Sequence, residues 1–154
     1  MTSELPIVGP ADVSASWVTE VLHRKGIEAT VDSVRLETVG TGQLAETRRI
    51  SIDHGGPAAT TAPGTLIGKF TSETPVAAET GHSLGIYRSE VMFYRELSAR
   101  AKIRTPEVYA AEKVALGATL LVKQTERGDR MLIRMITDAA THVLDTDALD
   151  LLGA

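Results

Sequence analysis

The chain contains no cysteine among its 154 residues. This absence excludes a disulfide framework, a thiolate zinc site, an iron–sulfur cluster and a cysteine nucleophile. It also fits a reducing compartment, where disulfides are rare. With 43% hydrophobic residues, a chain of this length predicts one ordinary domain that folds without the help of a metal or a disulfide.

The sequence also lacks the charge and the apolar runs that some partners require. It has 16 basic and 20 acidic residues, a net charge of −4, so no basic field is present to hold a nucleic-acid backbone. No apolar stretch approaches the ~20 residues of a membrane-spanning helix, and the first ten residues are not a secretory signal. These absences predict a soluble, cytoplasmic domain with neither a nucleic-acid nor a membrane partner.

The first half of the chain predicts a helix followed by three strands. Val13, Trp17 and Val21 share one helical face after Pro10, and Gly26 suits the end of that helix. Apolar patterning predicts the strands, which span 30–39, 46–53 and 65–70. The short loop between the first two strands contains glycine, so we expect these strands to form an antiparallel hairpin.

The second half predicts one helix and two strands. Residues 71–82 are polar and irregular, and a long helix is expected from about Leu84 to Lys102. The two further strand candidates span 107–114 and 118–125. The sequence therefore predicts an α+β fold with a five-stranded antiparallel sheet, a long helix after the third strand and an N-terminal helix.

Two charged residues lie where apolar ones are expected. Glu90 sits in the middle of an apolar helix face that comprises Ile86, Tyr87, Phe93, Tyr94 and Leu97. Lys69 interrupts an apolar strand on the side of Ile67. Taken singly, each has a plain explanation, because a strand-edge lysine can reach water and a glutamate can border the core. Taken together, they predict an ion pair with a nitrogen–oxygen distance within ~4 Å.

A glycine-containing loop, V-G-T-G-Q at residues 39–43, joins the first two predicted strands. Glycines there let the backbone approach a ligand closely, and its amides can face phosphate oxygens, although any hairpin can turn on glycines. The loop is not a Rossmann fingerprint, which needs a strand-to-helix turn. The segment at residues 64–70 is not a P-loop either, because one residue is missing between its glycines and Phe70 replaces Ser or Thr.

The order of glycine loop, strand lysine and helix glutamate is that of a protein-kinase N-terminal lobe. Four motifs occur in this order: V-G-T-G-Q-L-A-E-T-R-R-I, T-L-I-G-K-F, Y-R-S-E-V-M-F-Y-R-E-L and I-R-T-P-E-V-Y-A-A-E. Over roughly residues 7–122 the chain thereby resembles the aminoglycoside phosphotransferase and choline/ecdysteroid-kinase-like superfamily.

This resemblance implies a role for each motif. Lys69 would hold the nucleotide phosphates, Glu90 would orient Lys69, and adenine would stack near the strand at 118–125. The nucleotide-covering loop would comprise Gly40, Thr41, Gly42 and Gln43. The implied cofactor is ATP, with Mg²⁺ in the full-length family. The implied reaction transfers the γ-phosphoryl group to a substrate hydroxyl.

The end of the chain departs from this family. Members usually continue from the last strand with an acidic segment, but this chain reads Val122, Lys123, Gln124, Thr125. His142 does not have the spacing of the family's His-x-Asp catalytic loop. We therefore predict a kinase-like N-terminal lobe at 1–125 and a divergent or truncated tail at 126–154. No catalytic or metal-binding residue is predicted, so ATP binding is expected to be weak or to need a complementing lobe.

Two other interpretations and two partners stay open. The chain could be a non-catalytic binding or interaction domain, or a truncated gene product. The apolar residues that would face a second lobe in a complete kinase are Ile86, Phe93, Tyr94, Leu120 and Val122. They need cover from residues 131–152, from a second copy of the chain or from a complementing C-terminal lobe. The nucleotide is the expected small-molecule partner, and the phosphate acceptor stays open.

Overall fold

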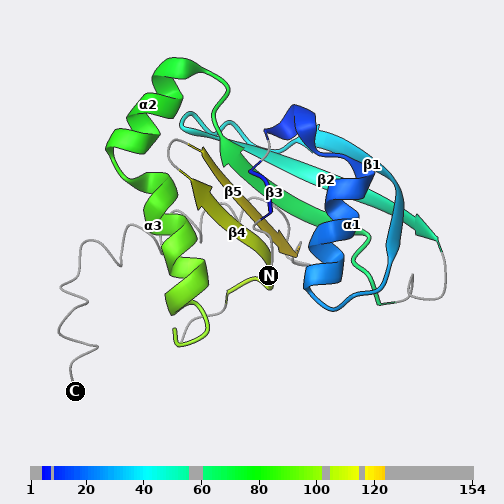
Figure 1. Cartoon of the computed structure of the whole chain (residues 1–154). Helices are drawn as coiled ribbons and strands as arrows, with labels where there is room; N and C mark the ends of the chain where they lie inside the picture. The colour runs from blue at the N-terminus through cyan, green and yellow to red at the C-terminus, as the bar shows by residue number, and fades with distance from the viewer. Residues whose placement is uncertain (1–4, 8, 56–60, 102–104, 115–116, 124–154) are drawn as a thin grey trace.

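The computed structural model describes residues 5–7, 9–55, 61–101, 105–114 and 117–123 (Figure 1). The strands are β1 (Thr30–Thr38), β2 (Ala45–Gly55), β3 (Thr65–Thr71), β4 (Val108–Val114) and β5 (Gly117–Lys123). The helices are η1 (Pro10–Asp12), α1 (Ala15–Arg24), α2 (Pro75–Ser83), α3 (Ile86–Met92) and the π-helical turn η3 (Phe93–Leu97). The α+β class is confirmed.

The strands form one antiparallel sheet in the order β1-β2-β3-β5-β4. The predicted hairpin of the first two strands is confirmed, with Leu36 opposite Ile50. Strand β3 lies between β2 and β5, so its side chains alternate between two covered faces. This central position explains why β3 is nearly continuously apolar, and why Lys69 within it is unusual.

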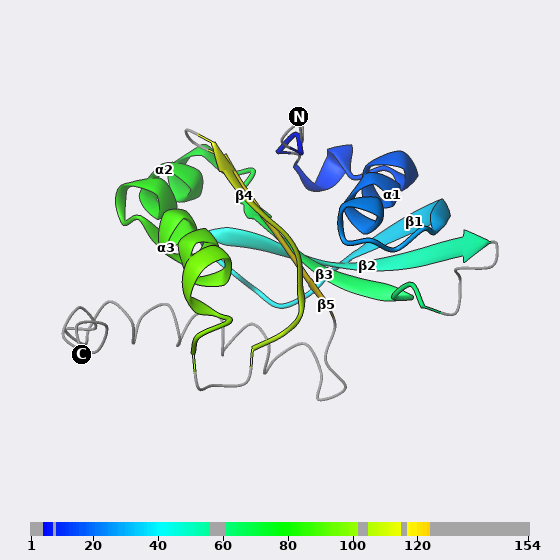
Figure 2. The same cartoon turned by 60° about the horizontal axis from the view of Figure 1, so that its bottom comes forward.

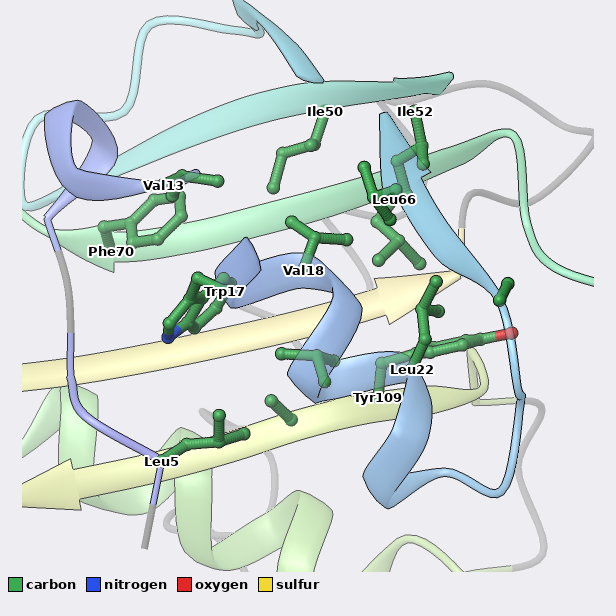
Figure 3. Packing of buried hydrophobic residues seen from close by; sticks show 14 residues of the cluster. Leu5, Val13, Trp17, Val18, Leu22, Ile50, Ile52, Leu66, Phe70 and Tyr109 are labelled. Atoms are coloured by element: carbon green, nitrogen blue, oxygen red, sulfur yellow. The ribbon is translucent and has the colours of Figure 1, made fainter. Parts of the chain in front are cut away.

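The first face of the sheet packs against α1 (Figure 3). Ser14 caps this helix, since its Oγ accepts a hydrogen bond from the Trp17 backbone N–H at 3.2 Å. The first core consists of Leu5, Val13, Trp17, Val18, Val21, Leu22, Ala29, Val31, Ile50, Ile52, Leu66, Phe70, Tyr109 and Ala110. All of these residues are apolar or aromatic, as in an ordinary hydrophobic core.

The second face packs against α3 and η3, on the side of the sheet opposite to α1 (Figure 2). The second core consists of Ala45, Ile67, Tyr87, Val91, Phe93, Tyr94 and Ala111. The rings of Phe93 and Tyr94 meet edge to face, with centroids 5.2 Å apart. The π-helical turn is closed by a hydrogen bond of 2.8 Å from the Ser98 backbone N–H to the Phe93 carbonyl.

The N-terminal helix begins later than the sequence suggested. Pro10 starts the short 3-10 helix η1, and α1 begins only at Ala15. The reason is Ser14, whose extended backbone and side-chain bond define a separate helix start. The residues expected on its apolar face, among them Trp17 and Val21, are buried as predicted.

The predicted long helix is wrong at both ends. Residues 71–82 were expected to be irregular, but Pro75–Ser83 form α2, which starts with Pro75 in its first turn. Gly85 then adopts a left-handed backbone with φ of 68° and separates α2 from α3. The helical segment continues through η3 only to Leu97, and Lys102 lies outside the described residues.

The apolar surface expected to need a partner is partly covered. Phe93 and Tyr94 are buried within the second core, and Ile86 is half-buried. The side chains of Leu120 and Val122, like residues 131–152, lie outside the described part. Within that part, no helix has the length and apolar character needed to cross a membrane.

Candidate functional site

Lys69 and Glu90 form a buried ion pair between β3 and α3. The Lys69 Nζ lies 2.9 Å from Glu90 Oε1 and 2.8 Å from Glu90 Oε2. The two side chains are 15% and 6% exposed, respectively. Strand alternation places Lys69 on the same face as Ile67, whereas Leu66 and Phe70 belong to the first core. The predicted ion pair is therefore confirmed.

The surroundings of this pair act on its charges in opposite directions. Burial raises the pKa of the Glu90 carboxyl, and the positive charge and hydrogen bond of Lys69 act to lower it. Burial and the nearby Glu90 charge also raise the pKa of the Tyr94 phenol well above its usual range. Tyr94 therefore stays protonated beside Glu90 at all physiological pH values.

The ion pair does not use the whole hydrogen-bonding capacity of Lys69. An ammonium group carries three N–H donors, and contacts with two carboxylate oxygens leave the third free of this pair. The Lys69 side chain is 15% exposed, so the protein does not enclose it completely. An ammonium held at a fixed position suits an anionic group such as a phosphate.

Strand β2 connects the base of the glycine loop with Lys69. The Val39 backbone N–H donates to the Thr47 carbonyl at 3.0 Å and closes the base of the loop. Thr47 in turn is the direct neighbour of Lys69 across the β2–β3 pair, and it is buried. The loop residues expected to cover a nucleotide, Gly40, Thr41, Gly42 and Gln43, are all exposed.

Both glycines of this loop are required by its backbone. Gly40 has a φ of 76°, which side chains other than hydrogen disfavour. A Cβ at Gly42 would lie 2.6 Å from the carbonyl oxygen of Ala45, closer than real contacts allow. The tight fold of the hairpin therefore accounts for these glycines without a ligand.

Sequence analysis missed a tyrosine that joins the loop to α3. The Tyr87 hydroxyl donates a hydrogen bond to the carbonyl of Leu44, where the loop returns to β2. The sequence placed Tyr87 only on the apolar face of the helix. Because a buried phenol needs a hydrogen-bond partner, its burial beside Glu90 was the signal that could have predicted such a link.

The start of β2 carries a second group of contacts that the sequence did not predict. Glu46 pairs with Arg48 at 2.5 Å and accepts a hydrogen bond of 3.3 Å from the Glu73 backbone N–H. Arg48 also donates to the Thr38 hydroxyl. These bonds fix the end of the hairpin to the segment that leads into α2.

The Mg²⁺ ion that the family resemblance implies has no donor set in this part of the chain. Among the described residues, no group of three or more His, Asp or Glu side chains is placed to hold a metal ion. His142, whose spacing was compared with the family's catalytic loop, lies outside these residues. We therefore assign no step to a metal ion here.

The site thus unites three of the features that the sequence singled out: the lysine, the glutamate and the glycine loop. The strand expected near adenine is also adjacent, because Leu120 of β5 is opposite Lys69. Comparison of the chain with protein-family models, with curated protein sequences and with solved structures gives no significant match.

Proposed function

We propose that this domain binds a nucleotide through its phosphates, as the N-terminal lobe of a small-molecule kinase-like phosphotransferase. Four features support this proposal: the sheet order, the glycine hairpin, the lysine on β3 and the glutamate on α3. In such a lobe the loop amides and the lysine hold the phosphates, and the glutamate holds the lysine. The full-length family would transfer the γ-phosphoryl group of ATP to a hydroxyl.

The observation that carries the proposal is the buried pair of Lys69 and Glu90. A buried ion pair is weak evidence for stability, because apolar residues of similar volume often stabilise a protein equally or better. Its presence in an otherwise apolar core therefore calls for another reason. Holding a cation at a fixed position for a phosphate supplies that reason.

The described residues supply phosphate binding but not the rest of phosphoryl transfer. Transfer needs a positioned acceptor hydroxyl and charge neutralisation at the γ-phosphate. Lys69 and the loop amides offer part of that neutralisation. The described part of the chain offers no acidic cluster for a metal. We therefore expect ATP to bind weakly and the chain alone to transfer no phosphate.

Titration of the full chain with ATP and with tripolyphosphate, followed by NMR chemical shifts, tests phosphate binding. We expect saturable binding of both ligands with a Kd on the order of 1 mM, since a single lobe covers only part of a nucleotide. Replacing Lys69 by Met should weaken binding of both by at least about tenfold, because charge-assisted hydrogen bonds are lost. Lys25→Met is the matched control, because Lys25 packs on Tyr109 in the first core.

Either of two results would contradict the proposal. One is an absence of saturable binding by the wild-type chain, which would favour a non-catalytic interaction domain. The other is equal affinity of the wild type and Lys69→Met. A turnover assay with Mg²⁺ and a panel of aminoglycosides, choline-like alcohols and sterols should give no product. Turnover that disappears in a Lys69→Ala variant would show that the chain is a complete enzyme.

A further inference from the structure

A direct hydrogen bond joins helix α3 to the end of the glycine loop, and Tyr87 donates it. Its hydroxyl donates to the Leu44 carbonyl, one residue beyond the nucleotide-covering segment 40–43. Tyr87 lies three residues before Glu90, on the same helix and one turn away. The phenol therefore connects the element that orients Lys69 with the loop expected to cover a ligand.

The surroundings of Tyr87 leave its ring little freedom. The residue is 3% exposed and belongs to the second core. On its other side is Gly81 of α2, where an added Cβ would lie 2.6 Å from both the Cζ and the Oη of Tyr87. The absence of a side chain at Gly81 thus makes the space in which the hydroxyl lies. The ring is held from α2 while its hydroxyl holds the loop.

We infer that Tyr87 is a positioning residue that couples the glycine loop to helix α3, so that the loop and the Lys69–Glu90 pair keep one geometry. This inference rests on the proposed function, because the loop and Lys69 are there assigned to the same phosphates. A shift of α3 that moves Glu90 also moves the hydroxyl that holds Leu44. The two halves of the phosphate site are thereby linked through a contact that touches no ligand.

The variant Tyr87→Phe tests the coupling, because it removes the hydroxyl and keeps the ring against Gly81. Hydrogen–deuterium exchange of the full chain should become faster at residues 39–45 by about three- to tenfold, the range that one ordinary hydrogen bond supports. Exchange in α1 should stay unchanged. Tyr109→Phe is the matched control, since this buried tyrosine belongs to the first core.

Nucleotide titration of the same variants separates positioning from packing. Tyr87→Phe should weaken tripolyphosphate binding by about three- to tenfold, whereas a residue that acts only by packing its ring would show no loss. Gly81→Ala should have the same effect from the other side, because its methyl group displaces the Tyr87 hydroxyl.

The two readouts also distinguish this inference from the proposed function. If the wild type binds neither ATP nor tripolyphosphate, the proposed function fails, and the exchange of residues 39–45 alone decides whether Tyr87 holds the loop. If the wild type binds but Tyr87→Phe matches it in both exchange and affinity, the positioning role of Tyr87 is overturned. Loss of affinity with unchanged loop exchange would also overturn it.

Discussion

The two faces of the sheet bury very different groups. The face toward α1 is covered by a continuous set of apolar side chains, with Val18, Leu22 and Ile50 completely buried. The face toward α3 has a smaller core that surrounds an ion pair and two tyrosines. The first face is organised as an ordinary hydrophobic core is. On the second face, charged and polar groups at fixed positions occupy part of the area that apolar side chains fill on the first face.

This difference assigns separate tasks to the two faces. The hydrophobic effect scales with buried apolar area, so most of the stability of the sheet should come from the face toward α1. The desolvation of Glu90 is a cost that its attraction to Lys69 offsets only in part. We therefore expect substitutions on the first face to change stability alone, and those at the ion pair to change stability and ligand binding together.

The largest effect should follow from leaving Glu90 without its partner. Lys69→Met is expected to lower the free energy of unfolding at pH 8 by about 3–5 kcal/mol, because a buried carboxylate is then uncompensated. Urea denaturation of the full chain measures this change. The control Lys25→Met breaks a surface pair with Glu107 and should cost less than about 1 kcal/mol. Equal losses of unfolding free energy in the two variants would contradict the claim that an unpaired charge on the second face is especially costly.

A cavity in the first face should be nearly as costly but should leave binding intact. Leu22 is fully buried, so Leu22→Ala should lower the free energy of unfolding by about 2–5 kcal/mol through lost burial and an unfilled volume. Because no ionisable group is involved, the loss should be the same at pH 5 and pH 8. A change in tripolyphosphate affinity in this variant would show that the two faces are not independent.

A change of pH should have a smaller effect on the free energy of unfolding. Burial raises the pKa of Glu90 in the folded chain above its ordinary value of 4.5, with Lys69 opposing the shift. Just above pH 4.5 the folded state therefore keeps a proton that the unfolded state releases. The contribution of Glu90 to stability is fully present below pH 4.5 and falls as the pH rises toward the folded-state pKa.

Urea denaturation from pH 4 to pH 8 measures this slope, with Glu90→Gln as the matched variant. The stability of the wild type relative to Glu90→Gln should fall as the pH rises. The fall should be steeper in the background of Lys69→Met, because the group that lowers the Glu90 pKa is gone. A rise of the relative stability with pH would show that Lys69 outweighs burial at this site.

The parts of this molecule that were predictable from its sequence are those with a local cause. Alternation predicted the first two strands, and helical spacing placed Glu90 on an apolar face, which led to the prediction of its ion pair with Lys69. Strand β3 was also predicted correctly, because Lys69 was treated as one charged residue within an apolar run.

The parts that were missed depend on contacts between distant segments or on single backbone states. Pro75 at the start of α2 was read as part of an irregular stretch, and the left-handed Gly85 that ends it has no apolar periodicity to mark it. The bond from Tyr87 to Leu44 joins residues 43 positions apart. Such a partner is decided by how α3 packs on the hairpin, which no local pattern contains.

The most direct test of the central claim replaces both charges at once. In Lys69→Met/Glu90→Leu, two apolar side chains of similar size take the place of the ion pair, and such exchanges are often neutral or stabilising. The free energy of unfolding of the double variant should lie within about 1 kcal/mol of the wild-type value or above it. Titrated with ATP and tripolyphosphate, it should bind at least about tenfold more weakly than the wild type. A double variant that binds both ligands with wild-type affinity, or that fails to fold, would contradict the claim that the pair is kept for a phosphate ligand.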